Sequence, residues 1–363
     1  MHNSITDNKR ASVLLSIIML TLCLLMTACD VTITTTGSNS GSASSSGNGS
    51  TNTSFTGSGA QNVQLYVEPD DGVTVVTQAI DNAQKSIWLE MYLFTNTTVL
   101  HALERAAQRG LDVRVMLEPH PVGGSSPTRV LDELQAAGAK TETTSPAFTL
   151  THEKGMVIDG KTAFIMTSNF TVSALGGSSH SSYRNREYGV IDSNPQDVQA
   201  VADIFTADWN RSNVQLTDPN LVVSPINSRA DFLKLINSAH HTLDIEAEEM
   251  QDSQIEQAIV SAGKRGVQVE VILPSASSAS TDSNRNGIDA IQGQNVKVEE
   301  DAKLYMHAKI IIVDGQEAFV GSENISTNSL DHNRELGIIV SDQNVLNRLE
   351  QTFQTDWGTS QAV

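Results

Sequence analysis

Short apolar runs alternate with amphipathic stretches along most of this chain, and the alternation predicts an α/β protein. Val, Ile and Leu are concentrated in strand-like segments at residues 63–67, 86–93 and 111–117. Between these segments, apolar residues recur at helical spacing over 74–84, 97–109 and 127–137. Gly110 lies where a helix would end before the next strand.

Beyond residue 154 the pattern changes from alternating helices and strands to a strand hairpin. The apolar runs 156–158 and 163–167 are separated by a segment that begins with Asp159-Gly160. The same arrangement recurs at 310–313 and 318–321, around Asp314-Gly315. Asp-Gly between two apolar runs is a strong signal for a tight hairpin turn.

The recurrence extends over almost the whole chain. Residues 87–90 and 109–115 correspond to segments 156 positions later, and Asn185–Gly189 corresponds to Asn333–Gly337, 148 positions later. We therefore expect two duplicated α/β halves, each a mixed, mostly parallel sheet flanked by helices. Their expected bounds are 61–215 and 216–363.

Within this duplication, one pattern of chemically reactive residues occurs twice. Lysine follows histidine by two positions, aspartate by seven and asparagine by seventeen. The two copies are His152, Lys154, Asp159, Asn169 and His307, Lys309, Asp314, Asn324. Their agreement at four positions inside a wider repeat argues against coincidence.

Residues two apart on a strand point to the same side, so each histidine would project with its lysine. If the halves meet about a pseudo-two-fold axis, both pairs form one cationic pocket. Ammonium groups can stabilise phosphate oxygens without a metal ion, while one imidazole attacks phosphorus and the other transfers protons. Glu187 and Glu335, at matched positions, are candidates for orienting the histidines; the alternative is a structural salt bridge with Arg186 or Arg334.

The paired His-x-Lys-x4-Asp motifs resemble those of the phospholipase D superfamily. The family pattern continues with Gly-Ser-x-Asn, which the second copy matches as Gly321-Ser322-Glu323-Asn324. The first copy reads Met166-Thr167-Ser168-Asn169. Thr167 keeps a hydroxyl that can form the same hydrogen bond, whereas Met166 is expected to change the shape of the pocket.

This resemblance implies cleavage or transfer at a phosphodiester through a covalent phosphohistidine, with both motifs in one active site and no cofactor. It implies His152 as the nucleophile and His307 as the acid and base. Asp159 and Asp314 are expected to hold the hairpin geometry. His120, His180, Glu248 and Glu249 could line the mouth of the site or lie exposed in loops.

The N-terminal region has the features of a bacterial lipoprotein signal. Lys9 and Arg10 precede an apolar run from Ala11 to Met26, and Met26-Thr27-Ala28-Cys29 resembles a lipobox. We expect a signal over residues 1–29, lipidation of Cys29, and a tether rich in Ser, Thr and Gly over residues 30–60. The only other cysteine is Cys23, so the mature chain would contain no disulfide.

Charge separates the candidate partners. The net charge is −19, which disfavours nucleic acid because its binding relies on basic surfaces. We therefore expect a monomeric enzyme outside the cytoplasm, anchored in the bacterial cell envelope and acting on phospholipid. A nuclease and a cardiolipin-synthase-like phosphatidyltransferase remain alternatives, whereas two complete His-Lys pairs argue against an inactive scaffold.

Overall fold

The computed structural model describes residues 59–176, 184–276 and 282–363. Cys29, the proposed signal, nearly all of the proposed tether and His180 lie outside these ranges. Within them, no helix combines the length and the apolar character that a membrane crossing requires.

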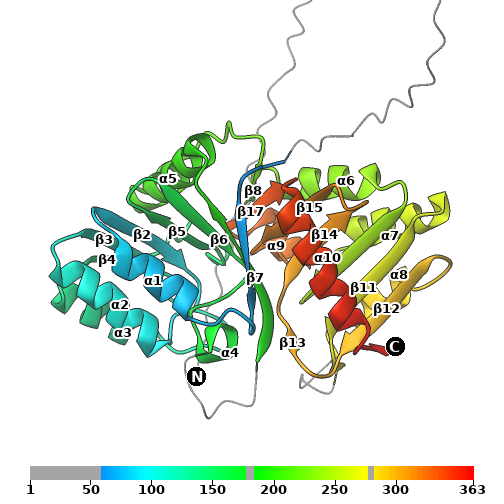
Figure 1. Cartoon of the computed structure of the whole chain (residues 1–363), viewed down its shortest axis with the longest axis horizontal. Helices are drawn as coiled ribbons and strands as arrows, with labels where there is room; N and C mark the ends of the chain where they lie inside the picture. Colours follow the sequence, from blue (N-terminus) through cyan, green and yellow to red (C-terminus); the bar gives the residue numbers. More distant parts are fainter. Residues whose placement is uncertain (1–58, 177–183, 277–281) are drawn as a thin grey trace, which may run out of the picture. The chain divides into compact units, whose positions relative to one another are not determined.

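The first half contains one sheet with the strand order β1-β7-β6-β5-β2-β3-β4 (Figure 1). The helices and strands expected from the sequence are present, with bounds that differ by a few residues. The elements are β1 (Gln64–Glu68), α1 (Thr74–Asn82), β2 (Ser86–Met91), α2 (Thr97–Gln108), β3 (Asp112–Leu117), α3 (Thr128–Ala136), β4 (Lys140–Thr143), β5 (Lys154–Ile158), β6 (Thr162–Met166), α4 (Val172–Leu175), β7 (Asn185–Asp192) and α5 (Pro195–Trp209).

The second half repeats this order as β8-β17-β15-β14-β9-β11-β12, with β18 added at the end. Its elements are β8 (Leu221–Ser224), α6 (Ser228–Ser238), β9 (Thr242–Ala247), β10 (Met250–Gln251), α7 (Ser253–Arg265), β11 (Gln268–Pro274), α8 (Arg285–Ile291), β12 (Val296–Asp301), β13 (Tyr305–Met306), β14 (Lys309–Val313), β15 (Glu317–Gly321), β16 (Ile325–Ser326), α9 (Thr327–Asp331), β17 (Glu335–Val340), α10 (Gln343–Trp357) and β18 (Gln361–Ala362).

Both sheets are mixed, but the expectation that they are mostly parallel is wrong. Among the described strands of the first half, β2–β3 and β3–β4 are the pairs that run in parallel, and these strands are joined by helical crossovers. The pairs β2–β5, β5–β6, β6–β7 and β7–β1 are antiparallel. The hairpin at Asp159-Gly160 accounts for the antiparallel β5–β6 pair, whereas β5 already runs opposite to β2 before the hairpin.

The two sheets share a hydrophobic core. Val157, Ile165 and Val190 from the first sheet cluster with Ile310 and Ile338 from the second. The opposite faces are covered by α1, α2 and α3 in one half and by α6, α7 and α8 in the other (Figure 1). Each sheet is therefore buried on both faces, which accounts for the nearly continuous apolar strands β5 and β14.

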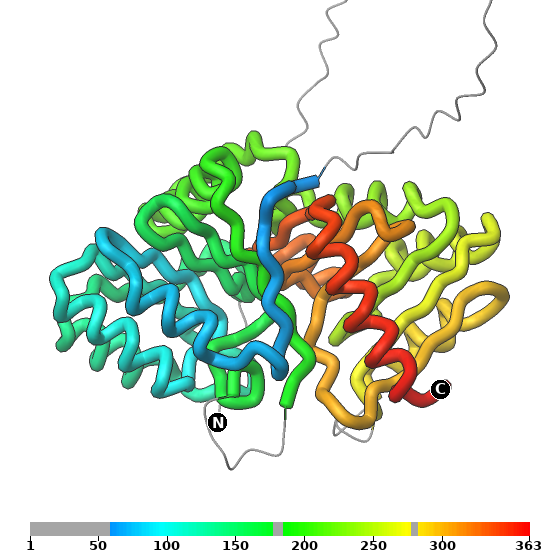
Figure 2. Tube along the Cα trace, in the orientation of Figure 1, coloured from blue at the N-terminus to red at the C-terminus, as the bar shows by residue number. Residues whose placement is uncertain are grey.

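Each half also contributes a short segment to the backbone pairing of the other. Strand β13, from the second half, pairs in parallel with the start of β7, beside which it runs in Figure 2. In the matching place, Thr151 forms a parallel bridge with Arg334, and the His152 N–H donates to the Arg334 carbonyl oxygen at 2.8 Å. The residues just before each His-Lys pair are thus fixed against the glutamate strand of the opposite half.

Gly337, in the centre of β17, marks a very close approach within the second sheet. A Cβ atom there would lie 2.2 Å from Cε2 of Phe319, a fully buried ring. Gly337 also pairs with Gly321 across the strands, so no side chain separates the two backbones.

We expect Gly337→Ala to lower the free energy of unfolding by about 1–3 kcal/mol, because the Phe319 ring must shift within a packed core. Urea denaturation followed by circular dichroism measures the change. Gly293→Ala is the matched control, since a Cβ at Gly293 meets nothing within 4 Å. Equal stabilities of the two variants would contradict this packing argument.

Candidate active site

The two histidines are each hydrogen-bonded to a glutamate of the other half. His152 Nδ1 lies 2.9 Å from Glu335 Oε2, and His307 Nδ1 lies 2.9 Å from Glu187 Oε2. All four residues are buried. With Nδ1–H donated to a carboxylate, the Nε2 atom of each neutral ring carries the free lone pair.

Both glutamates are held by hydroxyl groups from the motif that follows the hairpin. Thr167 Oγ1 donates to Glu187 Oε2 and Ser322 Oγ donates to Glu335 Oε2, each at 2.7 Å. The expectation that Thr167 preserves this hydrogen bond is confirmed. Asn185 and Asn333 donate further hydrogen bonds to the same carboxylates, as does Ser329 to Glu335.

The alternative pairing of the glutamates with neighbouring arginines is wrong. Arg186 binds Asp356 at 2.6 Å, and Arg334 binds Asp208 at 2.8 Å. Both ion pairs are buried and both cross between the halves, which leaves the glutamates to the histidines.

The lysines lie deep beside their histidines. Lys154 Nζ donates to the His152 carbonyl oxygen at 2.6 Å, and Lys309 Nζ donates to the His307 carbonyl oxygen at 2.7 Å. Burial lowers the pKa of Lys154 from 10.5 to about 7, and the nearby charge of Lys309 acts in the same direction. The two halves therefore bring both pairs into one buried region, as the motif spacing predicted.

The surroundings of the two pairs differ at one matched position that lies outside the motifs. Tyr92 in the first half corresponds to Glu248 in the second, 156 residues later. The Tyr92 ring packs edge-on against His152 at 4.5 Å and lies 5.2 Å from Lys154 Nζ. Glu248 instead accepts a hydrogen bond from Lys309 Nζ at 2.8 Å and lies 3.4 Å from His307 Nε2.

The electrostatic environment favours an unprotonated His152. Burial lowers the pKa of His152, and although Glu335 opposes this shift, Lys154 adds to it. Burial alone would raise the pKa of Glu335, but His152 and Lys154 hold it below its ordinary value. The pair is thus a neutral imidazole donating to an ionised carboxylate.

Asp159 and Asp314 lie at the hairpin turns, where their hydrogen bonds fit the structural role expected for them. The Asp159 carboxylate accepts from the backbone N–H groups of Gln84, Lys85 and Ser86. The Asp314 carboxylate accepts from the three N–H groups of residues 240–242. Each aspartate thereby ties the motif hairpin to the strand beside it.

The remaining motif residues lie either in the hydrophobic core or at the active site. Met166 is fully buried in the core between the first sheet and its helices, so the expectation that it shapes the pocket is wrong. Among the described residues, Asn169 and Asn324 each have a buried Oδ1 atom that accepts no hydrogen bond.

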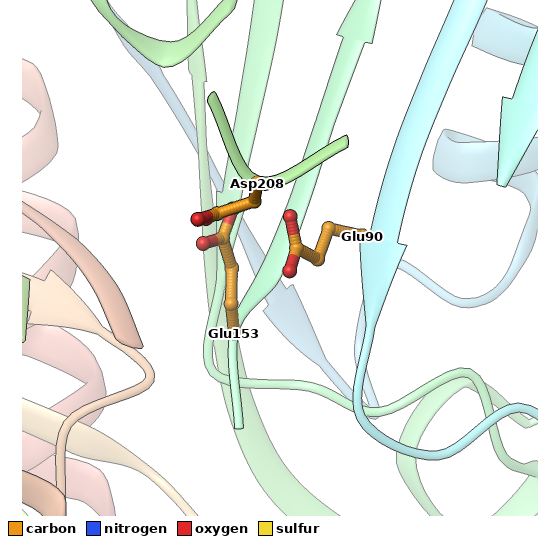
Figure 3. Close-up of side chains that lie close together, drawn as sticks. All are labelled: Glu90, Glu153 and Asp208. Atoms are coloured by element: carbon orange, nitrogen blue, oxygen red, sulfur yellow. The ribbon is translucent and has the colours of Figure 1, made fainter. Parts of the chain in front are cut away.

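A second group of acids lies behind the first motif. The carboxyl oxygens of Glu90, Glu153 and Asp208 lie within 4.8 Å of one another (Figure 3). Burial raises the pKa of Glu153 to about 8 and that of Glu90 well above its ordinary value, and each is raised further by a neighbouring carboxylate. Burial and the repulsion between neighbouring carboxylates therefore both favour the protonated form of these acids.

The duplicated half explains this acidic group. Glu246, the counterpart of Glu90, accepts a hydrogen bond from the Tyr188 hydroxyl at 2.7 Å. The positions that match Tyr188 and Glu153 are Leu336 and Ala308, so the tyrosine that binds Glu246 and the third acid near Glu90 both come from the first half. Both carboxyl oxygens of Glu90 are buried without a hydrogen-bond partner among the described residues, and protonation of Glu90 and Glu153 relieves the repulsion between them.

Comparison with known proteins agrees with this geometry. The family model described as "Cardiolipin synthase, PLD-like domain" matches residues 76–209 and 232–357. The chain therefore belongs to the phospholipase D superfamily, with one such domain in each half.

Two of the similar sequences are cardiolipin synthases. A cardiolipin synthase of Clostridium perfringens (strain SM101 / Type A) is 23% identical over 342 residues, covering 81% of this chain and 70% of that protein. A probable cardiolipin synthase of Bacillus subtilis (strain 168) is 22% identical over 338 residues, covering 83% and 67%.

The solved structures share the fold. The phosphatidylserine synthase of Haemophilus influenzae Rd KW20 superimposes with a TM-score of 0.64 at 14% identity, covering 84% of this chain and 88% of that one. The polyphosphate kinase of Porphyromonas gingivalis gives 0.65 at 18% identity, but this chain spans only 48% of its length.

Glu153→Gln tests whether the buried Glu153 carboxyl is protonated in the folded protein. A carboxyl whose pKa is raised from 4.5 to about 8 on folding stabilises the fold fully below pH 4.5 and loses that contribution as the pH rises through 8. The melting temperature of the variant minus that of wild type should therefore increase by about 3 °C or more from pH 5 to pH 8. Glu133→Gln, at an exposed site, controls for the lost charge. The same melting-temperature difference from wild type at both pH values would contradict the protonation of Glu153 in the folded protein.

Proposed function

We propose that this chain takes a phosphatidyl group from a phospholipid and passes it to an alcohol or to water through a covalent phosphohistidine. The crossed His–Glu pairs carry this proposal, because they give one site two imidazoles with defined tautomers. The cardiolipin synthases similar over four-fifths of the chain support a phosphatidyl group as the unit transferred.

In the first step His152 Nε2 attacks phosphorus. The P–N bond forms as the bond from phosphorus to the headgroup oxygen breaks, and His307 gives its Nε2 proton to the leaving oxygen. The lowered pKa of His152 supports its role as nucleophile. When His307 carries two protons, both of its N–H groups have a carboxylate oxygen to face, Glu187 on one side and Glu248 on the other.

In the second step the acceptor alcohol or water loses its proton to His307. Its oxygen then attacks phosphorus, the P–N bond breaks, and His152 becomes free again. Lys154 and Lys309, together with the amides of Asn169 and Asn324, are suited to hold the phosphate oxygens in both steps. None of these groups requires a metal ion.

We expect His152→Ala and His307→Ala each to lower kcat by at least about 10²-fold, because each removes a group that acts in the chemical step. Phosphatidylglycerol, phosphatidylcholine and single-stranded DNA are offered separately, with EDTA present, and products are identified by mass spectrometry. His101→Ala, on the exposed face of α2, is the matched control.

The outcomes separate the candidate reactions. Free headgroup together with phosphatidate indicates hydrolysis, and a new phosphatidyl ester indicates transfer. An adduct on the peptide containing His152 after alkaline quenching supports the assigned order. Cleavage of DNA without turnover of lipid would overturn the proposal in favour of a nuclease.

We further propose that the enzyme is a lipoprotein of the bacterial cell envelope, held near its substrate by acylation of Cys29. The lipobox-like Met26-Thr27-Ala28-Cys29 and the Ser/Thr/Gly-rich segment after it support this location. The acidic net charge would not draw the protein to anionic lipid, so an acyl anchor would supply that proximity.

Metabolic labelling with palmitate tests the anchor. The full-length chain, expressed in a bacterium, should incorporate the label and sediment with membranes, whereas Cys29→Ser should do neither. Cys23→Ser is the matched control, because it lies within the apolar part of the proposed signal. Labelling that persists in Cys29→Ser would contradict the lipoprotein assignment.

A further inference from the structure

Glu248 lies between the acid and base histidine and its lysine. One carboxylate oxygen accepts a hydrogen bond from Lys309 Nζ at 2.8 Å and lies 3.4 Å from His307 Nε2. The other accepts from the Tyr305 hydroxyl at 3.1 Å. Burial alone would raise the pKa of Glu248, but the charges of His307 and Lys309 hold it well below its ordinary value. A full negative charge therefore lies beside the nitrogen that serves the leaving and entering alcohols.

The duplication supplies an internal comparison. At the matched position the first half has Tyr92, which offers His152 and Lys154 only a ring face and edge. Both halves keep histidine, lysine and glutamate, so a carboxylate at this position is not needed to build the pocket. Because only His307 has a carboxylate at this matched position, Glu248 is expected to act on the group that lies on the His307 side of the phosphate.

Glu248 also lines a cavity of about 70 Å³ next to the site. The wall includes two more acids, Glu249 and Asp282, together with Ser283 and Asn284. Among the described residues that line it there is no lysine, arginine or histidine. A second phosphate in this space would meet like charges, whereas an ammonium or hydroxyl group would find acceptors.

We propose that Glu248 selects the alcohol that lies on the His307 side of the phosphate. It favours a small alcohol that carries additional O–H or N–H donors, and it disfavours an alcohol that carries an anionic group instead. The inference rests on the proposed function, because that function places the headgroup oxygen at His307. Glycerol and ethanolamine headgroups share the required chemistry. A nucleic acid strand, whose next phosphate follows within a few bonds, does not.

A purely structural role for Glu248 would have a different consequence. If it served only to neutralise Lys309, its removal would change turnover of every phosphodiester by a similar factor. If it binds the alcohol, its removal changes the ratio between substrates that differ only in the headgroup. The ratio of kcat/KM values is therefore the diagnostic quantity.

The experiment compares wild type, Glu248→Gln and Asp282→Asn on phosphatidylglycerol, phosphatidylethanolamine and phosphatidylmethanol in mixed micelles. The methyl headgroup of phosphatidylmethanol carries no O–H or N–H donor. We expect wild type to prefer the first two lipids over phosphatidylmethanol by about tenfold or more, in line with hydrogen bonds to a charged group. Glu248→Gln should reduce that preference to near unity, and Asp282→Asn should weaken it. Glu133→Gln, which removes an equal charge from the exposed surface of α3, should keep it.

A binding measurement makes the test independent of turnover. Glycerophosphoethanolamine and dimethyl phosphate, both soluble diesters, are titrated into the folded proteins and followed by nuclear magnetic resonance. Wild type should bind the first more tightly, and Glu248→Gln should bind both alike. Equal binding by wild type, or a preference that survives in Glu248→Gln, would overturn the inference.

Failure of the inference and failure of the proposed function give different results. Lipids cleaved at equal rates whatever the headgroup contradict the role of Glu248 and leave phosphatidyl transfer standing. DNA cleaved in place of lipid contradicts both. A headgroup preference seen in binding without lipid turnover supports Glu248 and contradicts phosphatidyl transfer.

Discussion

The hydrogen bonds from each histidine to the glutamate of the opposite half are the constraint on which the site depends. Glu187 and Glu335 are fully buried, and an isolated half would leave its carboxylate without the imidazole partner. The exchanged backbone pairings, β13 with β7 and Thr151 with Arg334, bring each histidine to that partner. Association of the halves and assembly of the reaction centre are therefore one event.

A second pair of crossed interactions surrounds the first. Arg186 binds Asp356 and Arg334 binds Asp208, again from one half to the other. Buried ion pairs of this kind add little net stability, but removing one partner is costly, so they make the arrangement of the halves specific. They also occupy the arginines that follow Asn185 and Asn333 in sequence, which keeps the neighbouring glutamates available to the histidines.

The sequence predicted the duplicated α/β halves, the hairpins and the residues of the site, because repeated spacing and alternating hydrophobicity are local properties. The sequence identified Glu187 and Glu335 as partners of the histidines, but it did not show that each glutamate binds the histidine of the opposite half. That pairing depends on how the two halves pack together. The mostly parallel sheet was wrong because β5 returns antiparallel to β2, a long-range pairing that local spacing does not reveal. Met166 was misplaced because sequence alone does not say which face of β6 meets the helices. Glu248 was named only as a candidate for the mouth of the site and Tyr92 was not named; asking where the repeats differ in charge would have paired the two positions.

The covalent joining of the two halves has a consequence for how such a site can change over time. Two identical copies related by symmetry would have to carry every substitution on both sides of the phosphate at once. In a single chain the copies vary independently, so one side can keep Tyr92 and Glu153 while the other carries Glu248 and Ala308. Fusion thus permits specialisation: two histidines of common origin can be given unequal surroundings and divide between them the work that a symmetric pair would have to share.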